Sequence, residues 1–94
     1  MTFEKLAKLV ADDFKATMLE EGFKTFKEMQ RCYDWDAQDI KDEVSSIINE
    51  LSAKYWEEEQ DYFFIADDCS FVQIGVCDEM SWGQFKKAIF EHVK

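Results

Sequence analysis

Apolar residues recur every three or four positions along four stretches of the chain, and this spacing predicts four amphipathic helices. The longest helix is expected to run from Asp36 to about Gln60. When its residues are advanced by about 100° each, seven apolar residues fall within an arc about 100° wide, the width of a core-facing stripe. These residues are Ala37, Ile40, Val44, Ile47, Ile48, Leu51 and Tyr55. Asp36 is the expected N-cap, and Asp39, three residues later in the sequence, is expected near the positive N-terminal end of the helix.

Two helices are predicted before the long one. The first is expected from about Phe3 to Glu21, because Thr2 suits an N-cap and Gly22 suits the left-handed position after a helix. Its expected apolar face comprises Phe3, Leu6, Ala7, Val10, Phe14 and Met18. A short second helix opens at Thr25, which has the spacing of a capping box with Glu28. The side chains expected to face inward from it are Phe26, Met29 and Tyr33, and Trp35 is expected to fill the space before the long helix.

After the long helix the apolar pattern changes to one typical of strands. The ranges 62–66 and 71–76 are rich in aromatic and β-branched residues, and the four residues between them suit a hairpin. Val72, Ile74 and Val76 are expected to face the helices. A last helix is expected from Ser81, again with a capping-box spacing to Gln84. Its expected apolar face comprises Trp82, Phe85, Ala88, Ile89 and Val93, with Lys86 and Lys87 pointing outward.

These elements predict a single α+β domain over residues 1–94, mostly helical, with the order α-α-α-β-β-α and one antiparallel hairpin packed on the helices. No apolar stretch approaches the roughly 20 residues that span a bilayer, and no stretch has the pattern of a signal peptide. We therefore expect no membrane association. Three cysteines, an odd number, favour reduced thiols and a cytoplasmic protein.

Charge is distributed unevenly along the chain. Residues 1–33 hold six acids and six bases, and residues 71–94 hold three of each, so both segments are neutral. Residues 34–70 hold twelve acids against two bases, Lys41 and Lys54, which accounts for the whole net charge of −10. This asymmetry favours a basic partner and argues against direct nucleic-acid binding, which requires lysine and arginine.

No catalytic, metal-binding or cofactor-binding motif is present. The only histidine, His92, could form a nucleophile–base pair with Cys32, Cys69 or Cys77, but no local signature surrounds these residues. The cysteine spacing does not match a zinc site, and the acids after Asp34 lack the glycine and glutamate of a calcium loop. We therefore predict no catalytic residue, no metal ligand and no cofactor.

The acids of the central segment are the predicted partner-binding residues. Several lie beside the core-facing stripe of the long helix, and Asp39 to Glu57 spans about 27 Å at 1.5 Å per residue. The full predicted set is Asp36, Asp39, Glu43, Glu50, Glu57, Glu58, Glu59, Asp61, Asp67 and Asp68. One interpretation is a solvated face that only maintains solubility. The other is a contact surface that imitates a phosphate backbone and occupies a basic groove.

The hairpin offers a second surface. Tyr62, Phe64 and Phe71 either pack into the core, the ordinary arrangement, or lie on the face away from the helices. In the latter case a free strand edge could also support a homodimer, and the acids would serve only solubility. A small enzyme using a cysteine and His92 is the remaining alternative.

In size, charge segregation and lack of a catalytic signature, the chain resembles the small acidic proteins of phages and mobile elements. Some of these, the anti-restriction and anti-CRISPR inhibitors, act as nucleic-acid mimics. The resemblance implies an inhibitor or adaptor that docks its acidic helix onto a basic surface of a protein partner, plausibly a surface that normally holds nucleic acid.

Overall fold

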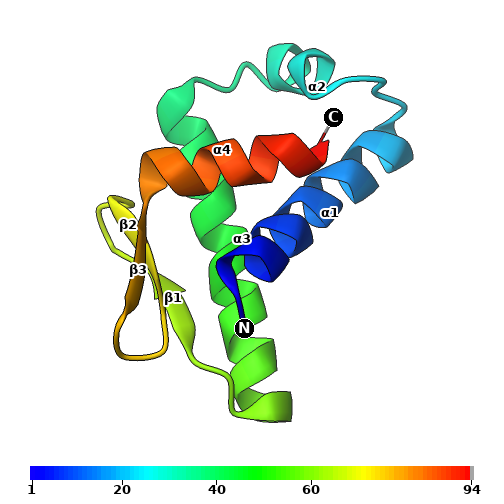
Figure 1. The fold of residues 1–94 in the computed structure, drawn as a ribbon. Coiled ribbons are helices and arrows are strands. Elements are labelled where there is room, and N and C mark those ends of the chain that lie inside the picture. Colours follow the sequence, from blue (N-terminus) through cyan, green and yellow to red (C-terminus); the bar gives the residue numbers. More distant parts are fainter. Residues whose placement is uncertain (94) are drawn as a thin grey trace.

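Residues 1–93, the part described by the computed structural model, form four helices and one three-stranded antiparallel sheet (Figure 1). In chain order the elements are α1 (Phe3–Glu21), α2 (Phe26–Cys32), α3 (Ala37–Glu59), β1 (Phe63–Ile65), β2 (Phe71–Ile74), β3 (Asp78–Ser81) and α4 (Trp82–Val93). The α+β class is confirmed, and one strand more than expected is present.

The ends of α1 and α3 lie where the capping residues predict them. The Thr2 hydroxyl accepts a hydrogen bond from the Lys5 amide at 3.1 Å, and Gly22 ends α1 in the left-handed conformation with φ 79°. At the start of α3 the Asp39 amide donates to the Asp36 carboxylate at 2.9 Å. The Asp36 amide donates in return to the Asp39 carboxylate at 3.0 Å. This reciprocal pair satisfies two amides that a helix start leaves without partners.

The predictions at the ends of α2 need correction. The Glu28 carboxylate accepts from the Lys24 amide at 2.8 Å, and not from the amide of Thr25, whose hydroxyl does cap α2. Tyr33 does not face inward. It is the residue that ends α2, it is 41% exposed, and its ring packs beside Trp35 with centroids 5.2 Å apart. At the start of α4 the prediction is confirmed: Ser81 ends β3 and its hydroxyl accepts from the Gln84 amide at 3.4 Å.

The sheet has the order β1-β2-β3. The predicted hairpin is β1 with β2, in the register Phe63 opposite Ile74 and Ile65 opposite Val72. The unexpected strand β3 pairs with the other side of β2. Val76, expected to face the helices, is 89% exposed, because β2 ends at Ile74 and Gly75 turns the chain with φ 64°.

One core joins the helices to the inner face of the sheet. Its fully buried large side chains are Phe63, Phe85, Leu6, Met29, Ile48, Ile89, Val10, Val44 and Val72. Along α3 the predicted core face is confirmed from Ile40 to Ile48, whereas Ala37 is exposed and Leu51 and Tyr55 are half-buried. The Trp35 side chain is half-buried against the core and contacts the rings of Phe14 and Phe26. It thus fills the space before α3, as predicted.

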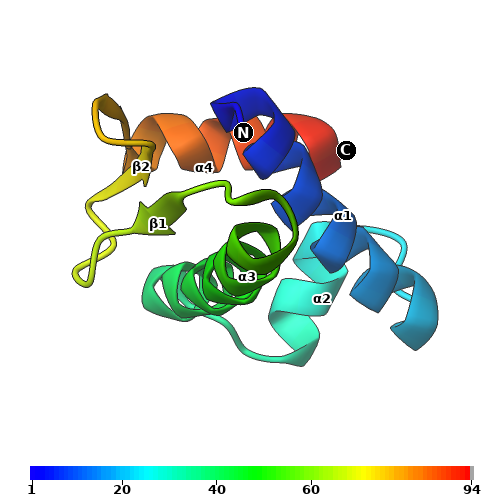
Figure 2. The same ribbon diagram turned by 90° about the horizontal axis from the view of Figure 1, so that it is seen from below.

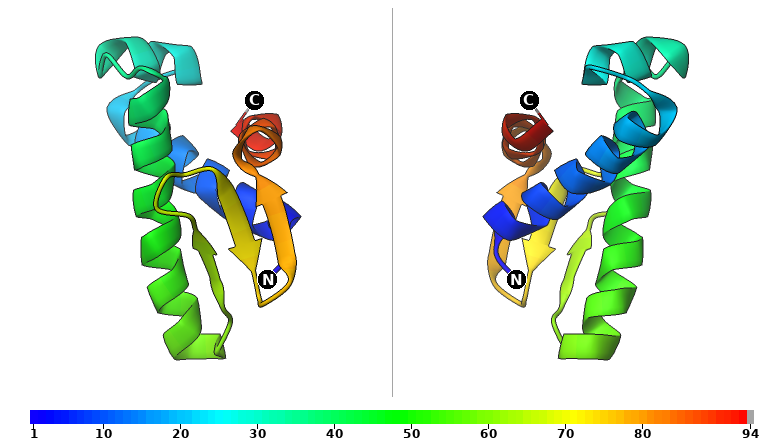
Figure 3. Two further views of the ribbon diagram at one scale, coloured as in Figure 1. Left: turned by 90° about the vertical axis from the view of Figure 1, so that its left-hand side faces the viewer. Right: turned by 90° about the vertical axis from the view of Figure 1, so that its right-hand side faces the viewer.

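The helix α3 forms one side of the molecule along its whole length. Viewed nearly along its axis, the sheet, α1 and α4 lie on one side of α3, and its opposite side carries no covering element (Figure 2). Its C-terminal end extends beyond α1 and α4, with β1 beside it (Figure 3). Among the described residues, no helix is long and apolar enough to cross a membrane.

Candidate interaction surface on α3 and the sheet

The exposed side of α3 carries a row of carboxylates. Glu43, Glu50 and Glu57 are exposed and stand seven residues apart, so they share one face and span about 21 Å. We call these three residues the acidic stripe. The ion pairs within residues 1–93 join other groups, and Lys54, one turn from Glu50, is the only base on this side of α3. The stripe therefore presents its charge to solvent.

Three of the predicted acids have structural contacts in addition to their charge. Asp36 and Asp39 cap each other's backbone at the start of α3. The Asp61 carboxylate lies 2.9 Å from the amino group of Met1, and only 22% of its side chain is exposed. These residues help to fix the ends of α3, so they are poorer candidates for contact with a partner than the acidic stripe.

The remaining predicted acids point away from the stripe. At about 100° per residue, Glu58 and Glu59 turn around α3 by about 100° and 200° from Glu57. Asp67 and Asp68 lie in the turn between β1 and β2. The structure therefore does not bring the whole predicted set onto one surface.

The position of Asp68 follows from its local contacts. Its carboxylate accepts hydrogen bonds from the Ser70 hydroxyl at 2.6 Å and the Ser70 amide at 3.0 Å, and these bonds lower the pKa of Asp68. Lys41 lowers this pKa further, which places the turn near Lys41. On the α3 helix Lys41 and Glu43 differ by about 160° in direction. The Asp68 turn and the acidic stripe are consequently on different sides of α3.

One acid that the sequence analysis did not select lies next to the acidic stripe. Partial burial raises the pKa of Asp13, on α1, and the nearby charge of Glu50 raises it further. The acidic region thus extends from α3 onto α1. Asp13 was missed because residues 1–33 are neutral as a segment, and only the packing of α1 on α3 brings this carboxylate to Glu50.

Four aromatic side chains form a continuous row from α3 across the outer face of the sheet. Successive ring centroids are 6.4 Å apart from Trp56 to Tyr62, 5.7 Å from Tyr62 to Phe64, and 6.3 Å from Phe64 to Phe71. All three pairs are edge to face. We call these four residues the aromatic row.

The aromatic row is separate from the core. Trp56 is 54% exposed and Tyr62 is 48% exposed, while Phe64 and Phe71 are half-buried on the sheet face opposite the core. Of the two arrangements expected for the hairpin aromatics, the one away from the helices is confirmed, and packing into the core is wrong for them. Trp56 directly precedes Glu57 at the C-terminal end of α3, but adjacent helix positions differ by about 100° in direction, so the aromatic row and the acidic stripe lie on neighbouring faces of the helix.

The two edges of the sheet differ. The Ser52 hydroxyl of α3 donates to the Phe63 carbonyl of β1 at 2.7 Å, so α3 covers part of the edge that the hairpin was expected to leave free. On the other side β3 is the outermost strand, with exposed Asp78 and Glu79. Acidic side chains on an edge strand discourage pairing with a second edge.

The cysteines and His92 lie on different elements. Cys32 ends α2 and is exposed, Cys77 lies exposed in the turn before β3, and Cys69 is buried between β1 and β2. The Nε2 atom of His92 is 3.1 Å from the Glu4 carboxylate of α1. Within residues 1–93, no group of three or more histidine, cysteine, aspartate and glutamate side chains is arranged to hold a metal ion.

Comparison of the chain with protein-family models, curated proteins and solved structures finds no match. The functional argument therefore rests on the geometry of the acidic stripe and the aromatic row.

Proposed function

We propose that this chain is a protein-binding module, an inhibitor or adaptor, that docks the acidic stripe and the aromatic row onto a basic surface of a partner protein. The observation that carries the proposal is the aromatic row, because Trp56 and Tyr62 expose large rings outside the core at the end of the helix that bears the acidic stripe. A charged helix face alone is common on small proteins. Exposed aromatic side chains outside the core are typical of binding hot spots.

The two parts of the surface have different physical roles. Tryptophan and tyrosine bury a large area at little entropic cost, so the aromatic row supplies affinity and sets the position of the partner. The carboxylates attract a basic surface from a distance and raise the association rate. Carboxylates spread over about 21 Å of a helix can occupy a groove that otherwise binds phosphates. This is the mode of action of the acidic anti-restriction and anti-CRISPR proteins that the chain resembles in character.

The proposal includes a cytoplasmic setting. Two of the three thiols, those of Cys32 and Cys77, are exposed and unbonded within the described chain, as suits a reducing compartment.

A charge-matched pair of variants tests the role of the acidic stripe. In the first, Glu43, Glu50 and Glu57 are changed to Gln. In the control, three other exposed acids are changed to Gln, namely Glu20, Glu21 and Glu91. Both variants lose three negative charges. Each is used to capture proteins from the native cytosol, and affinity is then measured with the purified partner.

We expect a basic partner whose affinity for the control is within about twofold of that for the parent. Its affinity for the stripe variant is expected to be at least about tenfold lower, and the complex dissociates as salt increases. Equal loss in both variants would show that net charge alone matters. Unchanged binding by the stripe variant would refute the proposed surface.

A second pair tests the aromatic row. Trp56→Ala is expected to weaken binding by about 2 kcal/mol or more, the scale of a hot-spot residue. Leu19→Ala is the control, because Leu19 is 85% exposed on α1, away from the row. If both substitutions are neutral for binding, the aromatic row is not part of the interface.

Self-association through a sheet edge is the alternative proposal, and β3 is the edge that remains open to it. It predicts a molecular mass that rises with concentration in light scattering and is restored to that of a monomer by Glu79→Pro, because proline blocks an edge pairing. A constant monomeric mass would exclude it.

A further inference from the structure

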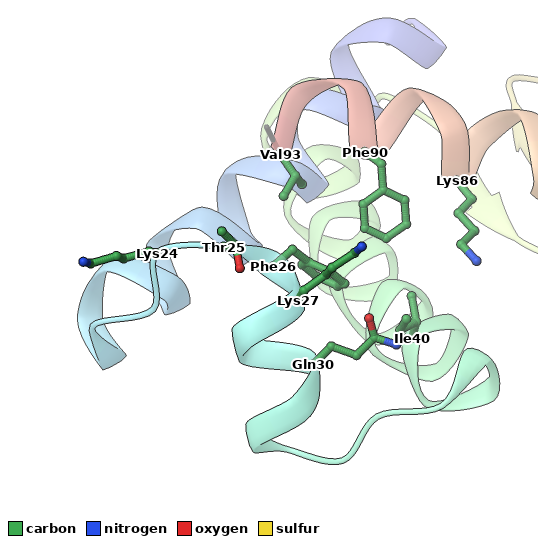
Figure 4. Close-up of a pocket in the computed structure, with 9 residues that line it drawn as sticks. All are labelled: Lys24, Thr25, Phe26, Lys27, Gln30, Ile40, Lys86, Phe90 and Val93. Atoms are coloured by element: carbon green, nitrogen blue, oxygen red, sulfur yellow. The ribbon is translucent and has the colours of Figure 1, made fainter.

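A groove of about 530 Å³ lies between α2, the first turn of α3 and α4. Its floor is apolar and consists of Phe26, Ile40, Phe90 and Val93 (Figure 4). The rings of Phe26 and Phe90 pack edge to face with centroids 4.9 Å apart. A concave space of about 300–1,000 Å³ with an apolar lining and a few polar groups is the usual form of a small-molecule site.

The charge at this groove is opposite to that of the protein. Three lysines line it, Lys24, Lys27 and Lys86, and no carboxylate does, in a chain with net charge −10. The side chains of Lys27 and Lys86 extend from opposite walls into the space beside Phe90, whereas Lys24 points away (Figure 4). The ion pairs within residues 1–93 include neither Lys27 nor Lys86. Two ammonium groups therefore stand at the mouth without a carboxylate partner.

Lys86 was expected to point outward and is instead half-buried in the wall of the groove. Its ammonium group lies 5.9 Å from the centroid of the Phe90 ring, which holds the charge close to the apolar floor. The next residue of α4, Lys87, is exposed and does not line the groove. Adjacent helix positions differ by about 100° in direction, so only one of these two neighbouring lysines brings its charge to the groove.

Gln30 adds a polar group to one wall. Its side-chain amide donates a hydrogen bond to the Trp35 carbonyl at 3.1 Å, which fixes the side chain in place. The groove thus combines an apolar floor, two cationic groups at its mouth and an oriented amide. Such an arrangement favours a ligand with an apolar body and one negatively charged end.

We propose that this groove binds a small amphipathic anion, an apolar chain or ring that carries one carboxylate or phosphate group. The apolar body lies over Phe26 and Phe90, and the anionic group lies between Lys27 and Lys86. This site is distinct from the aromatic row, because Ile40 and Trp56 are sixteen residues apart on α3, about 24 Å along its axis. Glu43, the nearest residue of the acidic stripe, is three residues from Ile40 and does not line the groove.

The probes are four compounds with a ten-carbon chain that differ in the head group and are used below their micelle concentrations. They are decanoate, decyl phosphate, decanol and decyltrimethylammonium. Calorimetry measures binding, and amide chemical shifts locate it. We expect saturable binding of an anion, at least about tenfold tighter than that of the alcohol or the cation, with shifts concentrated in residues 25–30 and 86–93. The tighter of the two anions identifies the head group as a carboxylate or a phosphate.

Charge-matched variants test the two lysines. Lys27→Gln with Lys86→Gln is expected to weaken the anion about tenfold, while Lys15→Gln with Lys87→Gln, the control, changes its affinity less than about twofold. The amide spectrum of each variant checks that the fold is retained. The proposal fails if neither anion saturates by about 1 mM. It also fails if the cation or the alcohol binds as well as the anions, if the shifts lie elsewhere, or if both double variants behave alike.

Discussion

Ser52 shows how a single side chain completes the contact between α3 and the sheet. Its hydroxyl donates to the outward-facing carbonyl of Phe63, an acceptor that β2 does not use. A carbonyl at this half-buried position loses its partner if the hydroxyl is removed, and an unsatisfied buried acceptor costs about 1–3 kcal/mol.

We expect Ser52→Ala to lower the free energy of unfolding by about 1–2 kcal/mol, measured by urea titration. Ser46→Ala is the matched control, since Ser46 is exposed on the same helix. That change should be neutral or stabilising by a few tenths of a kcal/mol, because alanine is the better helix former. Equal effects of the two substitutions would contradict the structural role of the hydroxyl.

The stability of the molecule should depend on the ionisation of Asp13. Its pKa is raised on folding, first by partial burial and then by Glu50. The folded chain therefore binds this proton more tightly than the unfolded chain, and the ionised carboxylate lowers stability at neutral pH. This loss disappears as pH falls through the raised pKa to below about 4, the value for an unfolded aspartate.

We therefore expect Asp13→Asn to stabilise the protein at pH 7, by less than about 1 kcal/mol because water screens an exposed carboxylate. The difference from the parent should vanish near pH 3 in parallel urea titrations. Asp12→Asn, which removes an exposed partner of Lys8 at 3.7 Å, should not show this pattern. A gain that persists at low pH would show that ionisation of Asp13 is not its cause.

At the scale of the elements, the sequence predicts the bounds of the two long helices well. Thr2 and Asp36 are N-cap residues with short-range partners, so local chemistry is enough to place α1 and α3. The end of α1 is marked by Gly22. The end of α3 has no glycine, and Gln60 itself adopts the left-handed conformation with φ 56°.

Gln60→Gly should stabilise the protein by about 0.5–1 kcal/mol, because glycine adopts a positive φ without the steric cost of a Cβ atom. Gln38→Gly, in the first turn of α3, should instead destabilise it by about 1 kcal/mol. Thermal or urea unfolding of the two variants measures both effects. Destabilisation by Gln60→Gly would mean that the hydrogen bond from its side chain to the Trp56 carbonyl outweighs the backbone gain.

The strand β3 was missed because nothing in its own residues indicates a strand. Asp78 and Glu79 have low strand propensity, and only Met80 is apolar among its first three residues. Pairing with β2 provides the hydrogen bonds that hold it, and the sequence of one strand does not encode such a partner. The wrong prediction for Val76 has a related cause. The alternating apolar pattern continues through Val76, although β2 ends at Ile74 and the chain turns at Gly75.

At the scale of the whole molecule, the surface was only partly predictable. The periodicity of α3 placed Glu43, Glu50 and Glu57 on one exposed face, because helix geometry is local. Residues joined by tertiary packing were not predictable in this way. Asp13 meets Glu50 across two helices, and the aromatic row joins α3 to two strands. The groove with Lys27 and Lys86 likewise needs three elements in their final positions.

The concentration of the net charge in residues 34–70 should make the fold more stable in salt. The twelve acids in this segment repel one another, and only two bases offset them. Raising the salt concentration from about 0.01 M to 0.15 M shortens the screening distance from about 30 Å to 8 Å. We expect the free energy of unfolding to rise over this range. The variant with Glu43, Glu50 and Glu57 changed to Gln should be more stable at low salt and less sensitive to salt. The charge-matched control at Glu20, Glu21 and Glu91 should keep a salt dependence of stability closer to that of the parent, since those acids lie in segments with balancing bases.

Partner binding is expected to weaken over the same range of salt concentration, whereas the stability of the fold is expected to rise. Loss of binding in salt then cannot be attributed to unfolding, whereas a fold that loses stability as salt rises would contradict the repulsion on which this prediction rests.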